Sequence, residues 1–390
     1  MEWVEKKSSE LYVSSSGLSK SSDQFGYGYP FLSYKDVFNN YYAPDKLSTL
    51  VNSTEKDRMK CSVKQGDVFL TRTSETTDEL GMSCVALHDY VNATFNGFTK
   101  RLRPLTDEIE PKYAAYYFRS PYFRSQCISL ASLITRASLN DGMIRRLKIR
   151  YPLNRKVQEK IGEILYTYDT LIENNTKRIR LLEKMAENLY KEWFVRFRFP
   201  GHENVEKENG LPKGWKYVNF SNLSPILTGK KDANYASQNG KYKFFTCSKN
   251  DLVADNYSFD CFAIILAGNG DLNVKLYDGQ FEAYQRTYVL SPYDVEHIYV
   301  SYYTIQSELD RLLVGAAGAV IKFLTKGMIE KIKVLLPTND VLVRFNSIQE
   351  HNYRLRQNLK RQNSLLARQR DLLLPRLMSG KLEVMEELLE

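Results

Sequence analysis

Apolar residues recur at intervals of three and four in two long stretches of this chain, a spacing that predicts two amphipathic helices. In the first stretch the row consists of Ile161, Ile164, Tyr168, Leu171, Asn175, Arg178, Leu182, Met185 and Leu189. In the second stretch it consists of Phe345, Ile348, Asn352, Leu355, Leu359, Gln362, Leu366, Gln369 and Leu373. Because polar residues interrupt both rows, neither helix is apolar enough to stand alone, and we expect the two to pack against each other.

The ends of both predicted helices carry local signals. Asn154 and Asn339 stand where the residue that caps a helix N-terminus is expected, since a short polar side chain can accept hydrogen bonds from the first free backbone N–H groups. Pro375 is expected to end the second helix, because proline has no backbone N–H to donate.

Elsewhere the pattern changes to short apolar runs bounded by turn residues, which is typical of strands. The predicted strands are Asp67–Arg72, Phe262–Leu266 and Thr287–Leu290. A turn is predicted at Gly268–Asp271, and further helices are predicted at Pro111–Leu130 and Glu296–Leu313. The chain is therefore predicted to belong to the mixed α/β (α+β) class.

The sequence also repeats itself. Gly142-Met143-Ile144 recurs 185 positions later as Gly327-Met328-Ile329, and a strand-like run of basic and apolar residues follows each copy. Earlier landmarks match at offsets of 212 and 213, and they pair Trp3 with Trp215, Ser9 with Ser221, Leu11 with Leu223, Gly17 with Gly229 and Tyr29 with Tyr242. A long helical stretch follows each copy. This self-similarity predicts a pseudo-two-fold architecture with two similar sites.

The repeat and the helical stretches divide the chain into six predicted segments. They are a first globular domain (1–152), a central helix (153–199), a polar linker (200–212), a second globular domain (213–337), a distal helix (338–382) and an acidic tail (383–390). Two globular domains connected by two long helices are thus expected.

Charge and composition narrow the class of partner that the chain is expected to bind. The formal net charge of +9 and the isoelectric point near 9.0 favour a polyanionic partner. The five cysteines and four histidines lie far from metal-ligand spacing, so no metal site is predicted and the thiols are expected to be reduced. The N-terminus shows no secretory pattern and no apolar run is long enough to span a membrane, so a cytoplasmic protein is expected.

The sequence contains no recognisable motif for catalysis or cofactor binding. The glycines of Gly315–Ala319 lack the spacing of a dinucleotide-binding loop, and the sequence contains no phosphate-binding loop or nucleophile elbow. It also lacks the Asn-Pro-Pro-Tyr or Asp-Pro-Pro-Tyr tetrapeptide with which amino-methyltransferases hold a flipped base. The sequence therefore indicates recognition rather than catalysis.

With these features, the chain resembles the DNA-specificity subunits of type I restriction–modification systems along essentially its whole length. The resemblance rests on the order and duplication of motifs, which are Gly66–Leu70, Asn188–Phe194, Leu211–Trp215 and Leu372–Leu382. It implies two target recognition domains, each of which reads half of a split DNA sequence. It also implies that the helices pair antiparallel, set the spacer between the half-sites and dock the methylation subunits.

The resemblance extends to partners and cofactors. Methylation subunits, restriction subunits and double-stranded DNA with a bipartite site are the implied partners. No cofactor is expected in this chain, since S-adenosylmethionine, ATP and Mg²⁺ would be bound by the partner subunits.

Candidate DNA contacts are cations that can neutralise phosphates and polar side chains that can reach base edges. In the first copy they are Arg72, Thr73, Ser74 and Thr76 after a strand, and the basic run Lys100, Arg101 and Arg103. In the second copy they are Lys230, Lys231, Asn234, Tyr235, Asn269, Asn273, Lys275 and Arg286. Each could also be an ordinary solvated surface residue.

Two alternatives remain open from the sequence. The chain could be a coiled-coil structural adaptor without sequence-specific DNA binding, whose basic charge is incidental. It could also be a fused enzyme with a divergent active site.

Overall fold

The computed structural model describes residues 2–74, 76, 79–130, 132–133, 137–315 and 323–384. The chain forms two compact units. The first unit comprises Met1–Thr176 and Lys360–Glu390, and the second comprises Lys177–Leu359. Each unit therefore holds one globular part and one half of each long helix. The division differs from the predicted segments, because it cuts both helices near their middle.

Two sheets organise the globular part of the first unit. A four-stranded antiparallel sheet has the order β2-β9-β5-β7, and a three-stranded sheet has the order β4-β3-β8. The strand bounds are β2 Tyr12–Ser16, β3 Phe25–Leu32, β4 Thr49–Val51, β5 Val68–Thr71, β7 Ser83–Val85, β8 Thr94–Phe95 and β9 Thr99–Pro104. Strand β5 confirms the strand predicted at 67–72.

Smaller strand groups complete this unit. They are the antiparallel pair β1 (Trp3–Lys7) with β12 (Lys148–Pro152), and the short strands β6 (Thr73–Ser74), β10 (Ser132–Leu133) and β11 (Ala137–Ser138). The helices are α1 Ser8–Leu11, α2 Tyr34–Asn39, α3 Glu55–Lys60, α4 Pro111–Tyr117, α5 Pro121–Leu130 and α6 Asp141–Arg146.

The second unit contains one six-stranded sheet in the order β16-β21-β19-β20-β17-β18. Its strands are β16 Ile226–Thr228, β17 Tyr242–Phe245, β18 Leu252–Ala254, β19 Phe259–Ala267, β20 Val274–Ala283 and β21 Thr287–Leu290. The pair β15 (Lys216–Asn219) with β22 (Lys333–Leu336) lies outside this sheet. Helices α8 (Ile298–Gly315) and α9 (Lys326–Glu330) complete the unit, and β19, β21 and α8 confirm the three elements predicted there.

The strand registers confirm the internal repeat. In the first unit Val68 of β5 faces Leu102 of β9, and in the second unit Ile264 of β19 faces Leu290 of β21. The pair β1 with β12 has the same place along the chain as β15 with β22, and a short helix precedes the closing strand in each unit. The fold is thus the predicted duplicated mixed α/β architecture.

One predicted helix is broken in two. Residues 111–130 form α4 and α5, which are separated by Phe118–Ser120. Pro121 explains the break, because proline cannot donate a helical hydrogen bond and disfavours the helical conformation of the preceding residue. The Ser120 hydroxyl then accepts a hydrogen bond from the backbone N–H of Phe123 at 3.3 Å, which caps the new helix.

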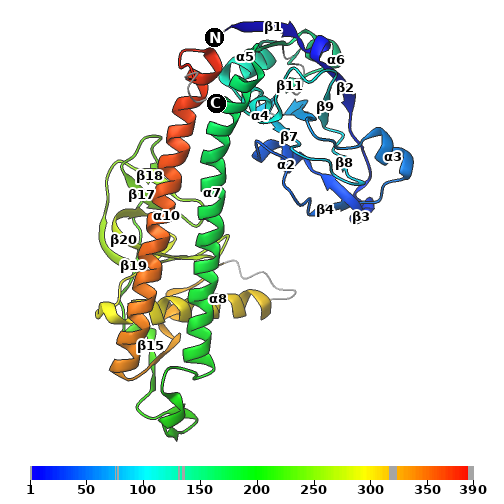
Figure 1. The fold of residues 1–390 in the computed structure, drawn as a ribbon. Coiled ribbons are helices and arrows are strands. Elements are labelled where there is room, and N and C mark those ends of the chain that lie inside the picture. The colour runs from blue at the N-terminus through cyan, green and yellow to red at the C-terminus, as the bar shows by residue number, and fades with distance from the viewer. Residues whose placement is uncertain are drawn as a thin grey trace. The chain divides into compact units, whose positions relative to one another are not determined.

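The two long helices are α7 (Arg155–Tyr190) and α10 (Asn339–Ser379), which run side by side in Figure 1. Asn154 caps α7 as predicted, since its Oδ1 accepts from the backbone N–H of Lys156 at 3.0 Å. Helix α10 already includes Asn339, so the predicted cap is one residue late. The prediction that Pro375 ends α10 is wrong, because the helix continues to Ser379 and Gly380 follows with a left-handed φ of 75°.

Within each unit the helices pair antiparallel. In the first unit Asn363 Nδ2 donates to the carbonyl oxygen of Ile172 at 3.4 Å, and Arg370 forms an ion pair with Asp169. In the second unit Asn352 Nδ2 donates to the carbonyl oxygen of Leu182 at 3.0 Å, and Gln349 Nε2 donates to that of Ala186 at 3.2 Å. Higher numbers on α10 thus match lower numbers on α7, which confirms the predicted antiparallel coiled coil.

The predicted rows of contact residues on α7 and α10 are partly wrong, because several true contact residues lie one position after the predicted ones. We call the residues on each helix that face the other helix the seam. On α7 the seam keeps Ile161, Asn175 and Leu182, but Ile172 and Ala186 replace the predicted Leu171 and Met185, which are exposed. On α10 the seam includes four polar residues that each lie one position after a predicted residue (Ile348, Leu355, Gln362 and Gln369), namely Gln349, Arg356, Asn363 and Arg370. Hydrogen bonds and ion pairs with α7 compensate for burying them.

The segment predicted as a linker is ordered. After a 3₁₀ turn at His202–Asn204, strands β13 (Lys207–Glu208) and β14 (Leu211–Pro212) form a hairpin. Its turn is Asn209-Gly210, and both residues have positive φ, at 51° and 81°. Asn-Gly is a favoured sequence for such a tight turn, so the hairpin signal was present in the sequence.

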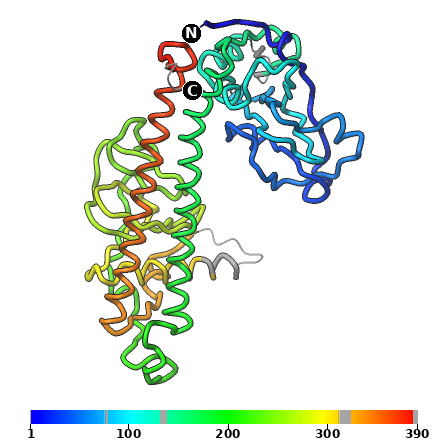
Figure 2. The backbone as a smooth tube through the Cα atoms, in the orientation of Figure 1, coloured from blue at the N-terminus to red at the C-terminus, as the bar shows by residue number. Residues whose placement is uncertain are grey.

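Each unit has its own hydrophobic core. In the first unit the main core packs α4 and α5 against the antiparallel sheet, and it includes buried Tyr113, Tyr116 and Phe118. The ends of the first unit also meet, because Trp3 lies against Gly380 at the end of α10, and Figure 2 shows these two ends of the chain side by side. None of the helices in the described parts of the chain is long and apolar enough to cross a membrane.

Candidate nucleic-acid interface

A hollow of about 470 Å³ lies at one end of the sheet in the second unit. We call it the β19–β21 hollow. Its lining is polar and aromatic and consists of Thr228, Gly268, Asn269, Gln285, Arg286, Tyr288, Phe323 and Leu324. The hollow brings together two predicted DNA contacts, Asn269 and Arg286, that are 17 positions apart in the sequence.

Two tight turns position these side chains. Asn269 follows β19, and Arg286 lies in the turn that precedes β21. The backbone N–H of Gly268 donates to the carbonyl oxygen of Arg286 at 2.9 Å, and a Cβ at residue 268 would lie only 2.5 Å from that oxygen. Glycine is therefore required for the two turns to approach each other this closely.

Arg286 and Asn269 keep their polar groups available. The Arg286 side chain is exposed, and its guanidinium has no ion-pair partner within the described ranges. The Asn269 amide has no side-chain hydrogen bond there either. Gln285 Nε2, in contrast, donates to Asp232 Oδ1 at 2.8 Å. A guanidinium and an amide in one open hollow are well suited to the acceptor and donor groups of base edges.

The polar loop before β17 borders the same hollow. The backbone N–H of Gln285 donates to the carbonyl oxygen of Lys231 at 2.9 Å, and the Lys231 ammonium lies 4.5 Å from the centroid of the Tyr235 ring. Lys230 and Asn234 are exposed in this loop. Of the eight residues predicted in the second copy, Asn269 and Arg286 thus line the hollow, and Lys231 is hydrogen-bonded to the turn that carries Arg286.

The remaining two residues have internal partners. Asn273 Nδ2 donates to the carbonyl oxygens of Cys247 and Asp271, and Lys275 Nζ donates to the carbonyl oxygen of Ser248 and to Asp251. Burial raises the pKa of the Asp251 carboxyl, but hydrogen bonds from Lys243 and Lys275 outweigh it and leave that pKa below its usual range. Asn273 and Lys275 therefore support the loop that carries Cys247.

The first unit has an equivalent place. The backbone N–H of Arg72 donates to the carbonyl oxygen of Phe98 at 3.2 Å, as Gly268 does to Arg286. By strand register Thr73 then corresponds to Asn269, and Phe98 corresponds to Arg286. Thr73 is half-buried, Thr76 is exposed, and Ser74 is buried with its hydroxyl donating to Glu79 at 2.7 Å.

The exposed aromatic residues at these two places were missed. Phe98 is 57% exposed and Phe323 is 63% exposed, although large apolar side chains are usually covered. Gln285 and Thr228 were also missed. An alignment of the two copies residue by residue would have found Phe98, because it stands where the second copy has Arg286.

The expectation that Lys100, Arg101 and Arg103 form an exposed basic run is wrong. They lie on β9, which is enclosed between β2 and β5, and Lys100 and Arg101 are only 4% and 7% exposed. Lys100 Nζ forms an ion pair with Asp141, and Arg101 Nη1 donates to the carbonyl oxygen of Ser62 at 2.6 Å. Burial lowers the pKa of the Arg101 guanidinium.

Arg103 also has an internal role. Its Nε and Nη2 donate to the two oxygens of the fully buried Asp67 at 2.8 and 2.7 Å. A two-pronged pair of this kind satisfies a buried carboxylate. A basic run in sequence was therefore a misleading signal, because alternate residues of a central strand face internal partners.

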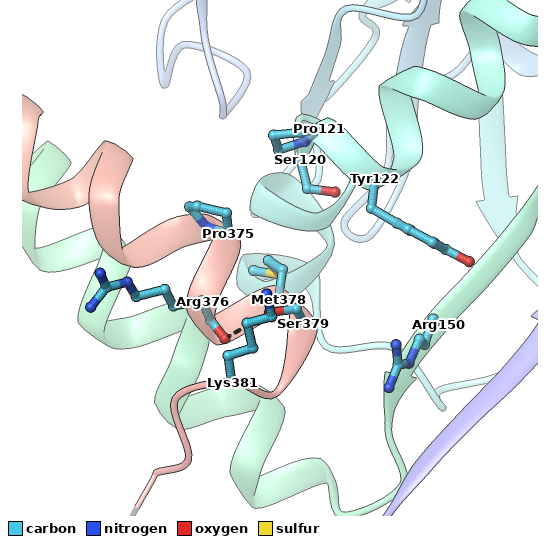
Figure 3. A pocket seen from close by; sticks show the side chains of 9 residues that line it. All are labelled: Ser120, Pro121, Tyr122, Arg150, Pro375, Arg376, Met378, Ser379 and Lys381. Atoms are coloured by element: carbon cyan, nitrogen blue, oxygen red, sulfur yellow. Dashed lines mark hydrogen bonds between the residues drawn. The ribbon is translucent and has the colours of Figure 1, made fainter.

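A second cavity, of about 700 Å³, lies within the first unit (Figure 3). It is bounded by the start of α5, β12 and the end of α10, and its basic lining residues are Arg150, Arg376 and Lys381. The Arg150 guanidinium is 5.0 Å from the Trp3 ring, and Glu5 faces Arg150 across the strand pair. None of the predicted DNA contacts lines this cavity, so we do not include it in the interface.

Metal chemistry has no evident place in the described ranges, where no group of three or more His, Cys, Asp or Glu side chains is arranged to hold an ion. The interface thus offers donors, acceptors and aromatic faces. Such groups are able to bind a polyanion and the edges of its bases, which makes these two equivalent places the candidate nucleic-acid contacts of a duplicated fold.

Comparisons with known proteins agree with this geometry. Residues 2–184 match the family model of the type I restriction modification DNA specificity domain. The specificity subunit of the Escherichia coli type I restriction enzyme EcoDI is 38% identical over 128 residues, which cover 33% of this chain and 29% of that protein. The MjaIX specificity subunit of Methanocaldococcus jannaschii is 24% identical over 99% of this chain and 94% of its own length.

A solved structure shows the same fold. The S subunit of a type I restriction–modification system from M. genitalium superimposes with a TM-score of 0.61 at 15% identity, over 96% of both chains. Over 99% of its length the chain is therefore similar to a type I specificity subunit, and over 96% of its length it shares the fold of another.

Proposed function

We propose that this chain selects a bipartite DNA sequence. The second unit would read one half-site at the β19–β21 hollow, and the first unit would read the other at the equivalent place beside Thr73 and Phe98. One observation carries the proposal. The two units share a backbone register, yet they present Asn269 and Arg286 in one unit and Thr73 and Phe98 in the other. Identical side chains would suit a site with identical halves, whereas different side chains at matched positions suit two different half-sites.

The experiment is a binding and modification panel. The chain and its methylation subunits are combined with duplexes in which each base pair of the modified site is replaced in turn. The proposal expects two clusters of sensitive positions separated by insensitive ones. A coiled-coil adaptor would give no sequence preference even with the methylation subunits present.

We also propose that the chain itself performs no chemical step. The methylation and restriction subunits would bind S-adenosylmethionine, ATP and Mg²⁺, and assembly on DNA in the cytoplasm would bring them to the site. The isolated chain is therefore expected to transfer no methyl group from S-adenosylmethionine to DNA. Transfer by the isolated chain would instead support the fused-enzyme alternative.

The paired helices have a second apolar row that supports docking of the methylation subunits. In the first unit Leu171, Leu365 and Leu372 each immediately precede a seam residue, and in the second unit Leu181, Met185 and Ile348 do so. These six side chains are between 43% and 67% exposed. We call them the outer row.

Helix geometry places the outer row on one side of the pair within each unit. Consecutive residues turn about 100° around a helix, and the two helices run in opposite directions. Residues that immediately precede seam positions therefore face the same side on both helices. A row of exposed leucine, isoleucine and methionine beside a seam is typical of a surface that packs against further helices.

We propose, finally, that the helices set the spacer between the half-sites. Helices α7 and α10 are each continuous from one unit into the other, which supports this role. Insertion of one heptad into both helices is expected to change the tolerated spacer and to leave the half-sites unchanged.

A further inference from the structure

A second exposed surface recurs in both units, at the hairpin that forms the edge of the sheet. In the first unit it consists of β3 and β4 with the neighbouring α3, which lie together in Figure 1. In the second unit it consists of β17 and β18. The sequence comparison paired Tyr29 with Tyr242, and the registers agree, since Tyr29 faces Val51 of β4 and Tyr242 faces Ala254 of β18.

In the first unit this hairpin presents two tyrosines to solvent. Strand β3 bulges so that both Phe25 and Tyr29 face Val51, and Gly26 and Gly28 have φ of 97° and 95°. A Cβ on Gly28 would lie 2.6 Å from the carbonyl oxygen of Val51, so only glycine fits. Tyr27 stands between these glycines at 49% exposure, and Tyr29 is 38% exposed.

A cation lies on the tyrosine next to the bulge. The guanidinium carbon of Arg58 on α3 is 3.8 Å from the centroid of the Tyr29 ring, and Arg58 Nη1 donates to the carbonyl oxygen of Ser53. No carboxylate pairs with Arg58 within the described ranges. The guanidinium is thus oriented by the ring and the carbonyl, and its charge is not neutralised.

The second unit reproduces this arrangement with other residues. The ring of Tyr257 lies 4.8 Å from that of Tyr242, and the Lys241 ammonium lies 5.4 Å from the Tyr242 centroid. Tyr257 is exposed and so is Lys241. A tyrosine with a cation over its ring therefore recurs at the same fold position, and in the second unit this tyrosine, Tyr242, is half-buried and also packs against the exposed Tyr257.

The hairpin and the hollow lie at opposite ends of one strand segment. From Tyr242 to Cys247 is five residues, or roughly 17 Å of extended chain. Cys247 Sγ contacts the carbonyl oxygen of Arg286 at the hollow, and Tyr34, five residues after Tyr29, donates from its hydroxyl to the carbonyl oxygen of Thr73. This separation is comparable with the ~12 Å major groove and its bordering phosphates.

We propose that the β3–β4 and β17–β18 hairpins contact the sugar–phosphate backbone that flanks each half-site. The inference rests on the proposed function, since it needs a duplex at the β19–β21 hollow and at the equivalent place beside Thr73 and Phe98. Tyrosine hydroxyls donate to phosphate oxygens, and arginine and lysine neutralise them. The hairpins then contribute affinity that does not depend on sequence, while the hollow and its equivalent contribute base preference.

The test uses the chain assembled with its methylation subunits. Binding to the modified duplex and to one with a replaced half-site is measured against salt concentration for wild type, Arg58→Ala and Arg58→Lys. Arg58→Ala is expected to weaken binding to both duplexes by the same factor and to lower the slope of log K against log salt by about 1. Arg58→Lys keeps the charge and is expected to keep the slope.

Controls separate the outcomes. Arg145→Ala removes an exposed arginine on α6 and is expected to leave both affinity and slope unchanged. Unchanged affinity and slope for Arg58→Ala and Tyr29→Ala, in a complex whose wild type discriminates the duplexes, would overturn the inference alone. A change of base preference would also overturn it. A wild-type complex that does not discriminate would instead contradict the proposed function.

Discussion

Asn269 and Thr73 occupy the same place in two copies of one backbone, and so do Arg286 and Phe98. A guanidinium can donate two hydrogen bonds to one guanine edge, whereas a phenyl ring can make only apolar contacts, such as with the thymine methyl group, and a threonine hydroxyl can form a hydrogen bond. In the proposed function, single residues would therefore decide what each unit can read, on a scaffold that the repeat holds constant.

The first prediction concerns Arg286→Ala in the second unit. It is expected to relax base preference at one or two positions of one half-site, with a loss of discrimination of about 1–3 kcal/mol. A panel of single base-pair replacements in a binding assay measures this. Phe98→Ala is the matched variant in the first unit, and its effect is expected in the other half-site. Both variants affecting the same half-site would contradict the assignment.

Arg103 is expected to stabilise the fold and to take no direct part in DNA recognition. Arg103→Ala leaves the buried Asp67 carboxylate without its two charge-assisted hydrogen bonds, at a cost of about 2–4 kcal/mol. Urea unfolding monitored by circular dichroism measures the loss. Asp67→Asn with Arg103→Ala together should recover part of it, because no buried charge remains. An unchanged unfolding midpoint for Arg103→Ala would refute the structural role.

Residues of this kind show what sequence alone could not resolve. The run Lys100, Arg101 and Arg103 has the composition of a phosphate-binding stripe, yet its strand is central in the sheet and each side chain has an internal partner. Composition reports charge but not which strand is enclosed. Asn269 and Arg286 line one open hollow, because the turns that carry them follow and precede strands and remain at the surface.

At the scale of elements, the positions of the long helices along the chain were predictable, but the side of each helix that faces the other was only partly predictable. The apolar residues Leu171 and Met185 fit a helical row as well as Ile172 and Ala186 do, so periodicity could not separate the seam from the outer row. The polar seam residues of α10, such as Asn352 and Gln349, weakened the correct row further. Their hydrogen bonds to α7 carbonyls are visible only once the helices are paired.

The outer row gives a prediction at this scale. Leu365→Ser with Leu372→Ser in the first unit is expected to impair assembly with methylation subunits. The free energy of unfolding is expected to stay within about 0.5 kcal/mol of that of wild type, since both side chains are exposed. Size-exclusion chromatography of the mixed subunits measures assembly. Lys360→Ser with Ser364→Ala on the same helix is the control pair, and it is expected to assemble normally.

Two further elements were missed for local reasons. Asn209-Gly210 is a hairpin turn inside a segment whose polar composition suggested a linker. Gly380, with its left-handed φ, is the signal that ends α10, whereas Pro375 lies one turn inside the helix. In both cases a strong compositional cue outweighed a more specific backbone cue.

At the scale of the whole molecule, the duplication is the property that the sequence reported most clearly. Each Gly-Met-Ile motif shortly precedes the strand that closes a globular part, β12 or β22. Trp3 and Trp215 lie at the strands that open these parts, β1 and β15, and each opening strand pairs with the closing one. Two copies connected by continuous helices suit a detector for a split site. In the proposed function, the spacing of the half-sites would depend on these helices.

The spacer prediction belongs to this scale. A heptad inserted into α7, with a matching heptad in α10, is expected to preserve the seam because seven residues restore its phase. Sequencing of methylated adenines in a host that carries the variant and its partner subunits should show the same half-sites with a changed spacer. An unchanged spacer would contradict the role of the helices.

The most direct test of the two-reader account is an exchange of one unit's globular part. Residues 1–150 are replaced by those of a relative with a different modified sequence, and methylated adenines are sequenced in hosts that carry each protein with its methylation and restriction subunits. The account predicts that one half-site changes to the relative's and the other stays the same. A change in both half-sites, or in neither, would contradict it.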